Sequence, residues 1–196
     1  MLVLPAPRPE DGPEDASRQG VTIYLCALGC DASAEMGLLT RELAQVFPAR
    51  VEEARPRKLP VPPESFSRRR SQYHSTVLLA WMAGKIPANQ RPVLGVVQVD
   101  LFVEELNFVF GEADPLRRVA VISTYRLHSD YSGGEVRPDV YQARVVKEAV
   151  HELGHVFGLG HCPDPRCVMH FSNSILDTDR KSKEFCRRCR MAFRIR

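Results

Sequence analysis

The sequence predicts an α/β fold, of the α+β kind, built on a mixed, mostly parallel, twisted sheet with an antiparallel edge strand. Two observations indicate this class. Strand-like and helix-like segments alternate early in the chain, as they do where helices join parallel strands. Apolar, β-branched runs then follow one another without helices, which indicates some antiparallel pairing. The length of 196 residues suits one domain with a buried core.

Two strands and two helices are expected in alternation in the first half of the chain. The first strand is a short apolar run, and the first helix follows it with Asp31 as the expected N-cap. Pro60, Pro62 and Pro63 require an extended loop before the second helix, because proline disrupts helix interiors. The expected ranges are residues 21–28 and 50–54 for the strands and residues 31–47 and 73–83 for the helices.

Strands dominate the middle of the chain, and a long helix follows them. The loop before this helix contains two glycines and ends at Asp139, which is the expected N-cap of a helix that runs to about Phe157. Clustered strands favour a mixed sheet over a purely parallel one. The expected ranges are residues 92–103, 106–110 and 119–127 for the strands and residues 129–138 for the loop.

The composition gives no general reason to expect a nucleic-acid or membrane partner. A net charge of +3 is ordinary, and no apolar run reaches the length of about 18 residues that a membrane span needs. Residues 1–20 hold four prolines and lack the basic flank and apolar stretch of a signal peptide, so we expect a disordered leader. A cytoplasmic protein is expected, in which the six cysteines are thiols or metal ligands.

The segment from His151 to His161 has the pattern of a zinc site. Residues four apart on a helix project from one face, so His151 and His155 can bind one ion. A continued helix would place His161 about 15 Å along the axis, so the helix must end first. Gly158 is placed to end it, because glycine adopts the left-handed conformation without a Cβ clash. His161 thereby becomes the third ligand.

Three imidazole ligands predict a catalytic zinc, because they leave the fourth position of a tetrahedral ion open for water. Glu152 is the expected general base, which takes a proton from water and delivers it to the leaving amine. The predicted function is therefore hydrolysis of peptide bonds in a peptide or protein substrate. The alternative is a set of core and surface histidines beside a solvated glutamate.

Two close cysteine pairs predict a second, structural zinc. Four residues separate Cys162 from Cys167 and two separate Cys186 from Cys189, which is ordinary spacing for a tetrathiolate zinc that binds no water. The alternative is four reduced thiols packed as small hydrophobic groups. The remaining cysteines and histidines have no such spacing and are expected to be packed or surface groups: Cys26, Cys30, His74, His128 and His170.

In these motifs the chain resembles the archaemetzincins, a family of the metzincin metallopeptidases. Met169 stands where metzincins have a methionine turn beneath the zinc. The resemblance implies one catalytic and one structural zinc, and a sheet with two large helices, one carrying the active site. It also implies an N-terminal subdomain at residues 21–158 and a small C-terminal subdomain at residues 159–196, within one catalytic domain. The matching residues are His151, Glu152, His155, Gly158, His161, Cys162, Cys167, Met169, Cys186 and Cys189.

Two other functions stay open at this point. Residues 180–196 hold eight basic residues and one acidic residue, so a zinc-ribbon-like nucleic-acid binder is one alternative, although a solvated face is the preferred interpretation. The other is a zinc protein with latent or no catalysis that acts through interactions. The sequence distinguishes neither aminopeptidase from endopeptidase action nor one oligomeric state from another.

Overall fold

The computed structural model describes residues 20–129 and 134–193. All but the last residue of the expected leader therefore lies outside the described residues, as does the middle of the expected loop at residues 129–138.

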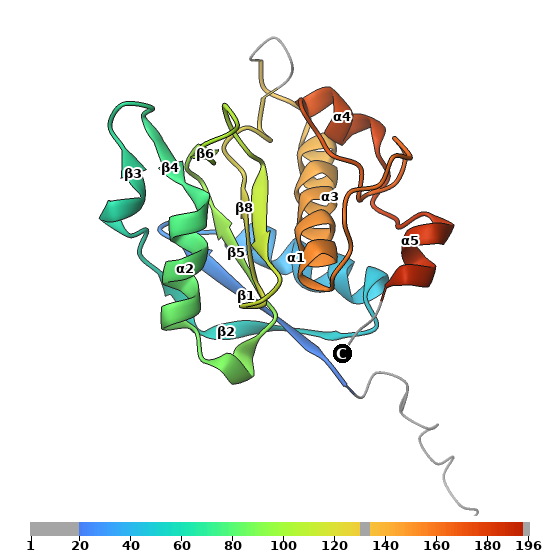
Figure 1. Ribbon diagram of the computed structural model, residues 1–196, viewed down its shortest axis with the longest axis horizontal. Helices are drawn as coiled ribbons and strands as arrows, with labels where there is room; N and C mark the ends of the chain where they lie inside the picture. Colours follow the sequence, from blue (N-terminus) through green and yellow to red (C-terminus); the bar gives the residue numbers. More distant parts are fainter. Residues whose placement is uncertain (1–19, 130–133, 194–196) are drawn as a thin grey trace, which may run out of the picture.

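A five-stranded sheet in the order β2-β1-β5-β8-β7 forms the centre of the fold (Figure 1). Its first four strands are parallel, and β7 pairs antiparallel with β8 at one edge. The predicted mixed sheet with an antiparallel edge strand is thus confirmed. A small second sheet has the order β3-β4-β6. The strands are β1 (Thr22–Leu28), β2 (Arg50–Leu59), β3 (Phe66–Ser67), β4 (Gln72–His74), β5 (Val93–Val97), β6 (Leu101–Phe102), β7 (Gly111–Asp114) and β8 (Val119–Ser123).

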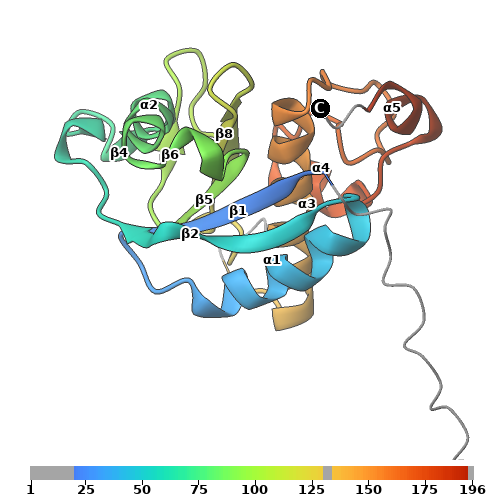
Figure 2. The same ribbon diagram turned by 90° about the horizontal axis from the view of Figure 1, so that it is seen from below.

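Helices cover both faces of the central sheet (Figures 1 and 2). Leu94 of β5 packs toward α1 and α3, whereas its neighbour Val93 packs toward α2. Every residue of β5 and β8 is buried, and burial on both faces explains why the two strands carry apolar runs, ended in β8 by Ser123, rather than an alternating pattern. The helices are α1 (Ser33–Val46), α2 (Ser75–Lys85), α3 (Pro138–Val156), α4 (Ile175–Arg180) and α5 (Arg187–Ala192), with short 3-10 turns at Pro63–Ser65 and Ala88–Gln90.

The expected strand at residues 106–110 is wrong, and the edge strand β7 comes directly after it. Side chains from an earlier segment hold this stretch as a loop: Arg70 donates to the carbonyls of Leu106 and Asn107, and Gln72 also donates to Asn107. The edge strand β7 carries two acidic residues and is only partly buried. A search for apolar runs therefore finds the loop and misses the strand.

Both predicted helix caps are wrong by one or two residues. Ala32 is the N-cap of α1, and Asp31 lies before it and accepts a hydrogen bond from the Ser33 backbone. Pro138 begins α3, because its fixed φ and missing N–H suit the first helical position. Asp139 therefore lies within the first turn, where it pairs with the preceding arginine instead of capping the helix.

The other expected ranges need smaller corrections. The run at residues 92–103 is divided between β5 and β6, and the run at residues 119–127 ends as a strand at Ser123. A turn follows there, in which the Leu127 N–H donates to the Thr124 carbonyl. Both helices expected in the first half of the chain are present within two residues of their expected limits.

Leu94→Ala should lower the free energy of unfolding by about 2–5 kcal/mol, because it leaves a cavity in the fully buried layer between the sheet and α3. Urea denaturation measures the change. Leu116→Ala is the matched control, since Leu116 is 96% exposed and its truncation should change stability by less than about 0.5 kcal/mol. Equal effects of the two substitutions would contradict the packing described.

Candidate metal centre

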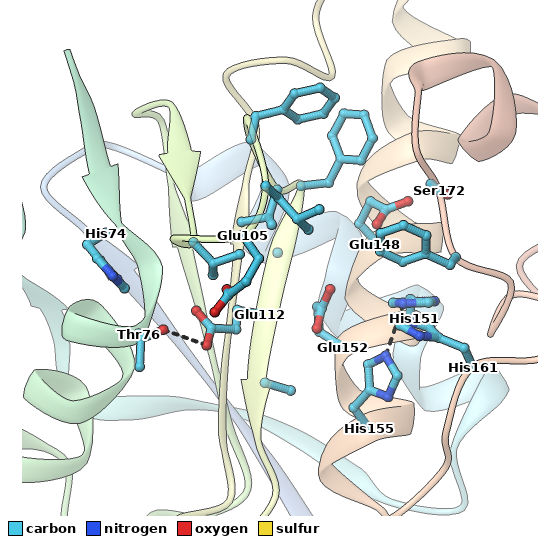
Figure 3. A pocket seen from close by; sticks show the side chains of 18 of the residues that line it. His74, Thr76, Glu105, Glu112, Glu148, His151, Glu152, His155, His161 and Ser172 are labelled. Atoms are coloured by element: carbon cyan, nitrogen blue, oxygen red, sulfur yellow. Dashed lines mark hydrogen bonds between the residues drawn. The ribbon is translucent and has the colours of Figure 1, made fainter. Parts of the chain in front are cut away.

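The last two turns of α3 and the segment after them bring three imidazoles together (Figure 3). The Nε2 atoms of His151 and His155 lie 3.1 Å apart. The His161 ring centroid lies 5.4 Å from that of His151 and 4.8 Å from that of His155. One ligand atom from each residue lies within 4.8 Å of the others. The three histidines predicted as ligands are therefore adjacent in space.

The return of His161 depends on how α3 ends. Gly158 has φ +88°, the left-handed conformation expected of it. Its N–H donates to the His155 carbonyl, and the Leu159 N–H donates to the Gly154 carbonyl. These two bonds form a Schellman motif, which satisfies the last carbonyls of the helix while the chain turns back.

Backbone carbonyls orient the two helical histidines. His151 Nδ1 lies 2.7 Å from the Val168 carbonyl, and His155 Nδ1 lies 2.7 Å from the Leu159 carbonyl. Because a carbonyl oxygen can only accept, both Nδ1 atoms carry the proton and both Nε2 lone pairs face the shared space. Burial lowers the pKa of all three histidines, most strongly that of His151. Neutral imidazoles with free Nε2 atoms suit zinc.

Glu152 faces the same cavity from α3 (Figure 3). Its side chain is 5% exposed, and burial, followed by the nearby carboxylates of Glu148 and Glu112, raises its pKa well above the usual range. Glu152 packs directly on β7: a Cβ added at Gly111 would lie 2.7 Å from its Cγ. The absence of a side chain at Gly111 thus makes room for Glu152 between α3 and the edge strand.

Met169 lies buried against the opposite side of α3. A Cβ added at Gly154 would lie 2.4 Å from the Met169 Sδ, so only glycine allows this approach without a shift. The Met169 carbonyl accepts a hydrogen bond from the Cys162 N–H, which ties the two ends of the returning segment together. The preceding carbonyl, that of Val168, orients His151.

The four cysteines of the two predicted pairs form a second cluster. Their Sγ atoms lie within 4.8 Å of one another, and those of Cys162 and Cys186 are 3.8 Å apart. The backbone N–H of Cys189 lowers the pKa of Cys186 to about 7, so a thiolate forms readily there. The Arg188 guanidinium donates to the Cys162 Sγ. Four sulfurs at these distances have the composition of a closed zinc site.

A buried ion pair joins α3 to the C-terminal segment. Lys181 is fully buried, with its Nζ 3.0 Å from the Glu148 Oε1, a contact whose geometry falls short of a hydrogen bond. The Thr178 hydroxyl donates to the same oxygen. Removing either partner would leave a buried charge unpaired, so this contact holds the segment against the helix one turn before His151.

A cavity of about 560 Å³ lies between α3 and the edge strand, and its far wall contains residues that spacing did not reveal. Glu112 of β7, Thr76 of α2 and His74 line the side of the cavity away from the histidines, and the Glu112 carboxylate points toward Thr76 (Figure 3). His74, expected as a packed or surface group, is partly exposed and lines this cavity. Among the remaining histidines, His128 stacks on a tyrosine and His170 bonds to the Cys162 carbonyl.

This fold and the cluster of three histidines fit a family of peptidases. More particularly, the chain belongs to peptidase family M54, whose model matches residues 89–194. An archaemetzincin from Pyrococcus abyssi is 55% identical over 101 residues, which are 52% of this chain and 54% of that protein, so the chain matches about half of that relative's length. The resemblance to the archaemetzincins is therefore confirmed.

Solved structures extend the likeness to nearly the whole fold. The crystal structure of archaemetzincin from Archaeoglobus fulgidus, complexed with malonate, has a TM-score of 0.74 and 38% identity, and the match covers 87% of this chain and 99% of that one. A zinc-dependent peptidase from Methanocorpusculum labreanum has a TM-score of 0.75 and 29% identity, with 88% and 98% covered.

Gly154→Ala should lower the free energy of unfolding by about 1–3 kcal/mol, because its methyl group would overlap the buried Met169 sulfur. Gly37→Ala is the matched control: Gly37 also lies in a helix, but an added Cβ meets nothing within 4 Å there. That control should be neutral or stabilising by up to about 1 kcal/mol. Denaturant unfolding of both variants tests the contact, and similar changes in the two would contradict it.

Proposed function

We propose that the protein hydrolyses peptide bonds, with His151, His155 and His161 as ligands of a catalytic zinc and Glu152 as general base. One observation carries the proposal: three neutral imidazoles and a buried carboxylate face one cavity, and two of the imidazoles lie on the same helix as the carboxylate. When bound, zinc polarises the scissile carbonyl and lowers the pKa of a water molecule toward about 7.

Glu152 performs the proton transfers in this proposal. Its carboxylate takes a proton from the attacking water and passes it to the nitrogen of the leaving amine. The raised pKa favours this role, because a base that must also release its proton works best when its pKa lies near the working pH. Burial between α3 and Gly111 keeps the carboxylate in one position.

The edge strand β7 supplies a binding surface for an extended substrate in this proposal. The Ser123 N–H donates to the Phe110 carbonyl, and bonded residues in an antiparallel pair alternate with residues whose backbone groups point away. Gly111 and Ala113 therefore present their N–H and C=O groups at the outer edge of the sheet, and both line the cavity. A peptide paired with them lies beside Glu152.

A second zinc, bound by Cys162, Cys167, Cys186 and Cys189, completes the proposal of two ions per chain. Cys162 directly follows the third histidine, so the thiol cluster fixes the chain next to His161. Its proposed role is structural, within a C-terminal subdomain at residues 159–196 that follows the N-terminal subdomain at residues 21–158.

A cytoplasmic location is part of the proposal. Metal-binding thiols must stay reduced, and the cytosol keeps them so. All six cysteines are free thiols in the structure. Separately, none of the helices in the described residues is long and apolar enough to cross a membrane.

Peptides are favoured over nucleic acids as partners. Four of the six basic residues that the structure describes between positions 180 and 193 make contacts within the chain, which reduces the charge available to phosphates. A salt-sensitive shift of labelled DNA or RNA at low micromolar protein would support the nucleic-acid alternative instead. The residues with these contacts are Lys181, Lys183, Arg188 and Arg190.

Glu152→Gln should lower kcat/KM by about 10²–10⁴-fold, because the amide cannot accept the water proton. The variant should keep its full zinc content, since Glu152 is not a proposed ligand. A peptide-library cleavage assay with elemental analysis measures both properties. Glu64→Gln, an exposed glutamate far along the chain from the site, is the control. Full activity of Glu152→Gln would refute the assignment of the base.

His155→Ala should reduce the metal content from two zinc ions per chain to one and abolish cleavage. Cys186→Ser should remove the other ion, because a tetrathiolate site loses one of its four ligands. Elemental analysis of the purified variants gives the count. Cys26→Ala, at a thiol outside both clusters, should keep both ions. Two ions without any peptide cleavage in the unchanged protein would select the non-catalytic alternative.

A further inference from the structure

We propose that the cavity wall opposite the three histidines binds a cationic group of the substrate, with Glu112 as the carboxylate that contacts it. The inference rests on the proposed peptidase function and names its substrate class: peptides with a lysine or arginine side chain, or a free terminal ammonium, beside the scissile bond.

The charge of the cavity differs from that of the chain. Five glutamates line it, and no lysine or arginine stands among the described residues of its lining, although the chain carries a net charge of +3. Low-dielectric walls strengthen the resulting negative potential, which attracts a cation. The five are Glu104, Glu105, Glu112, Glu148 and Glu152.

Two of these carboxylates already have a role, and Glu112 does not. Glu148 pairs with the buried Lys181, and Glu152 is the proposed base. Glu104 and Glu105 are exposed residues at the rim, and the Glu104 side chain is 68% exposed and 3.6 Å from the imidazole of His74. Glu112 is thus the carboxylate deeper in this wall that has no other role and can contact a substrate.

The hydrogen bonding of Glu112 is incomplete. Its Oε1 accepts a hydrogen bond of 2.8 Å from the Thr76 hydroxyl, which fixes the direction of the carboxylate (Figure 3). Its Oε2 is buried and has no hydrogen-bond partner within the described part of the chain. A buried carboxylate oxygen without a donor is costly, so the geometry calls for a donor from outside the chain. A substrate ammonium or guanidinium supplies both the donor and the opposite charge.

Glu112 also lies close enough to the proposed base to contact substrate residues beside the scissile bond. It follows Gly111, where an added Cβ would lie 2.7 Å from the Cγ of the proposed base, Glu152. A cation held by Glu112 therefore lies within one or two residues of the bond to be cut, since extended peptides advance about 3.3 Å per residue.

Peptide binding tests this inference without requiring turnover. The zinc-loaded Glu152→Gln protein would be used, and fluorescence anisotropy would measure its Kd for pairs of matched peptides. At each position near the cleavage site, one peptide of a pair carries lysine and the other carries its uncharged analogue norleucine. The lysine peptide should bind at least about 10-fold more tightly. Adding Glu112→Gln should bring the two Kd values close together. Peptides with an acetylated N-terminus distinguish a side-chain cation from the terminal ammonium. If acetylation abolishes tight binding and the change from lysine to norleucine does not, the site binds the terminal ammonium.

The inference would be overturned if all peptides of the series, with free and with acetylated N-termini, bound with equal Kd values. This outcome does not depend on whether the Glu112→Gln variant folds. Equal weakening of every peptide by Glu112→Gln would also overturn the inference. Cleavage by the unchanged protein is a separate measurement. Cleavage without any preference for charge defeats this inference alone, whereas charge-dependent binding without cleavage defeats the proposed peptidase function and leaves the cation site in place.

Discussion

The end of α3 at Gly158 is the constraint on which the site depends. The helix alone can present His151 and His155 on one face, but it carries any later residue away along its axis. The left-handed glycine and the two hydrogen bonds of the Schellman motif reverse the chain within three residues and return His161 to the other two rings. Backbone conformation, rather than packing, thus sets His161, the third proposed ligand, in place.

Two glycines then allow other parts of the chain to close on this helix. On one side, Gly111 lets Glu152 pack against the edge strand, and on the other, Gly154 lets Met169 pack beneath the histidines. The carbonyl before Met169 fixes the His151 ring. The proposed base and ligands are therefore positioned by segments on both sides of one helix. The buried pair of Lys181 with Glu148 holds the C-terminal segment in contact with this helix.

The sequence predicts the parts of the site that follow from local spacing. The histidines, Glu152 and the helix end are all within eleven residues, and the cysteine pairs are equally local. Glu112 and His74 come from segments about 40 and 80 residues earlier, and no spacing connects them with α3. The central sheet was predicted because its buried strands consist largely of apolar runs. The position of the antiparallel edge strand was missed because acidic residues and partial exposure hide its pattern.

Anomalous diffraction at the zinc edge, from crystals of the protein purified without added metal, tests the central claim most directly. We predict two peaks per chain: one at about 2 Å from the Nε2 atoms of His151 and His155 and from a ring nitrogen of His161, and one at about 2.3 Å from four cysteine sulfurs. A first peak bound by His151 and His155 alone, with His161 turned away, would contradict the account of how the helix end creates the site.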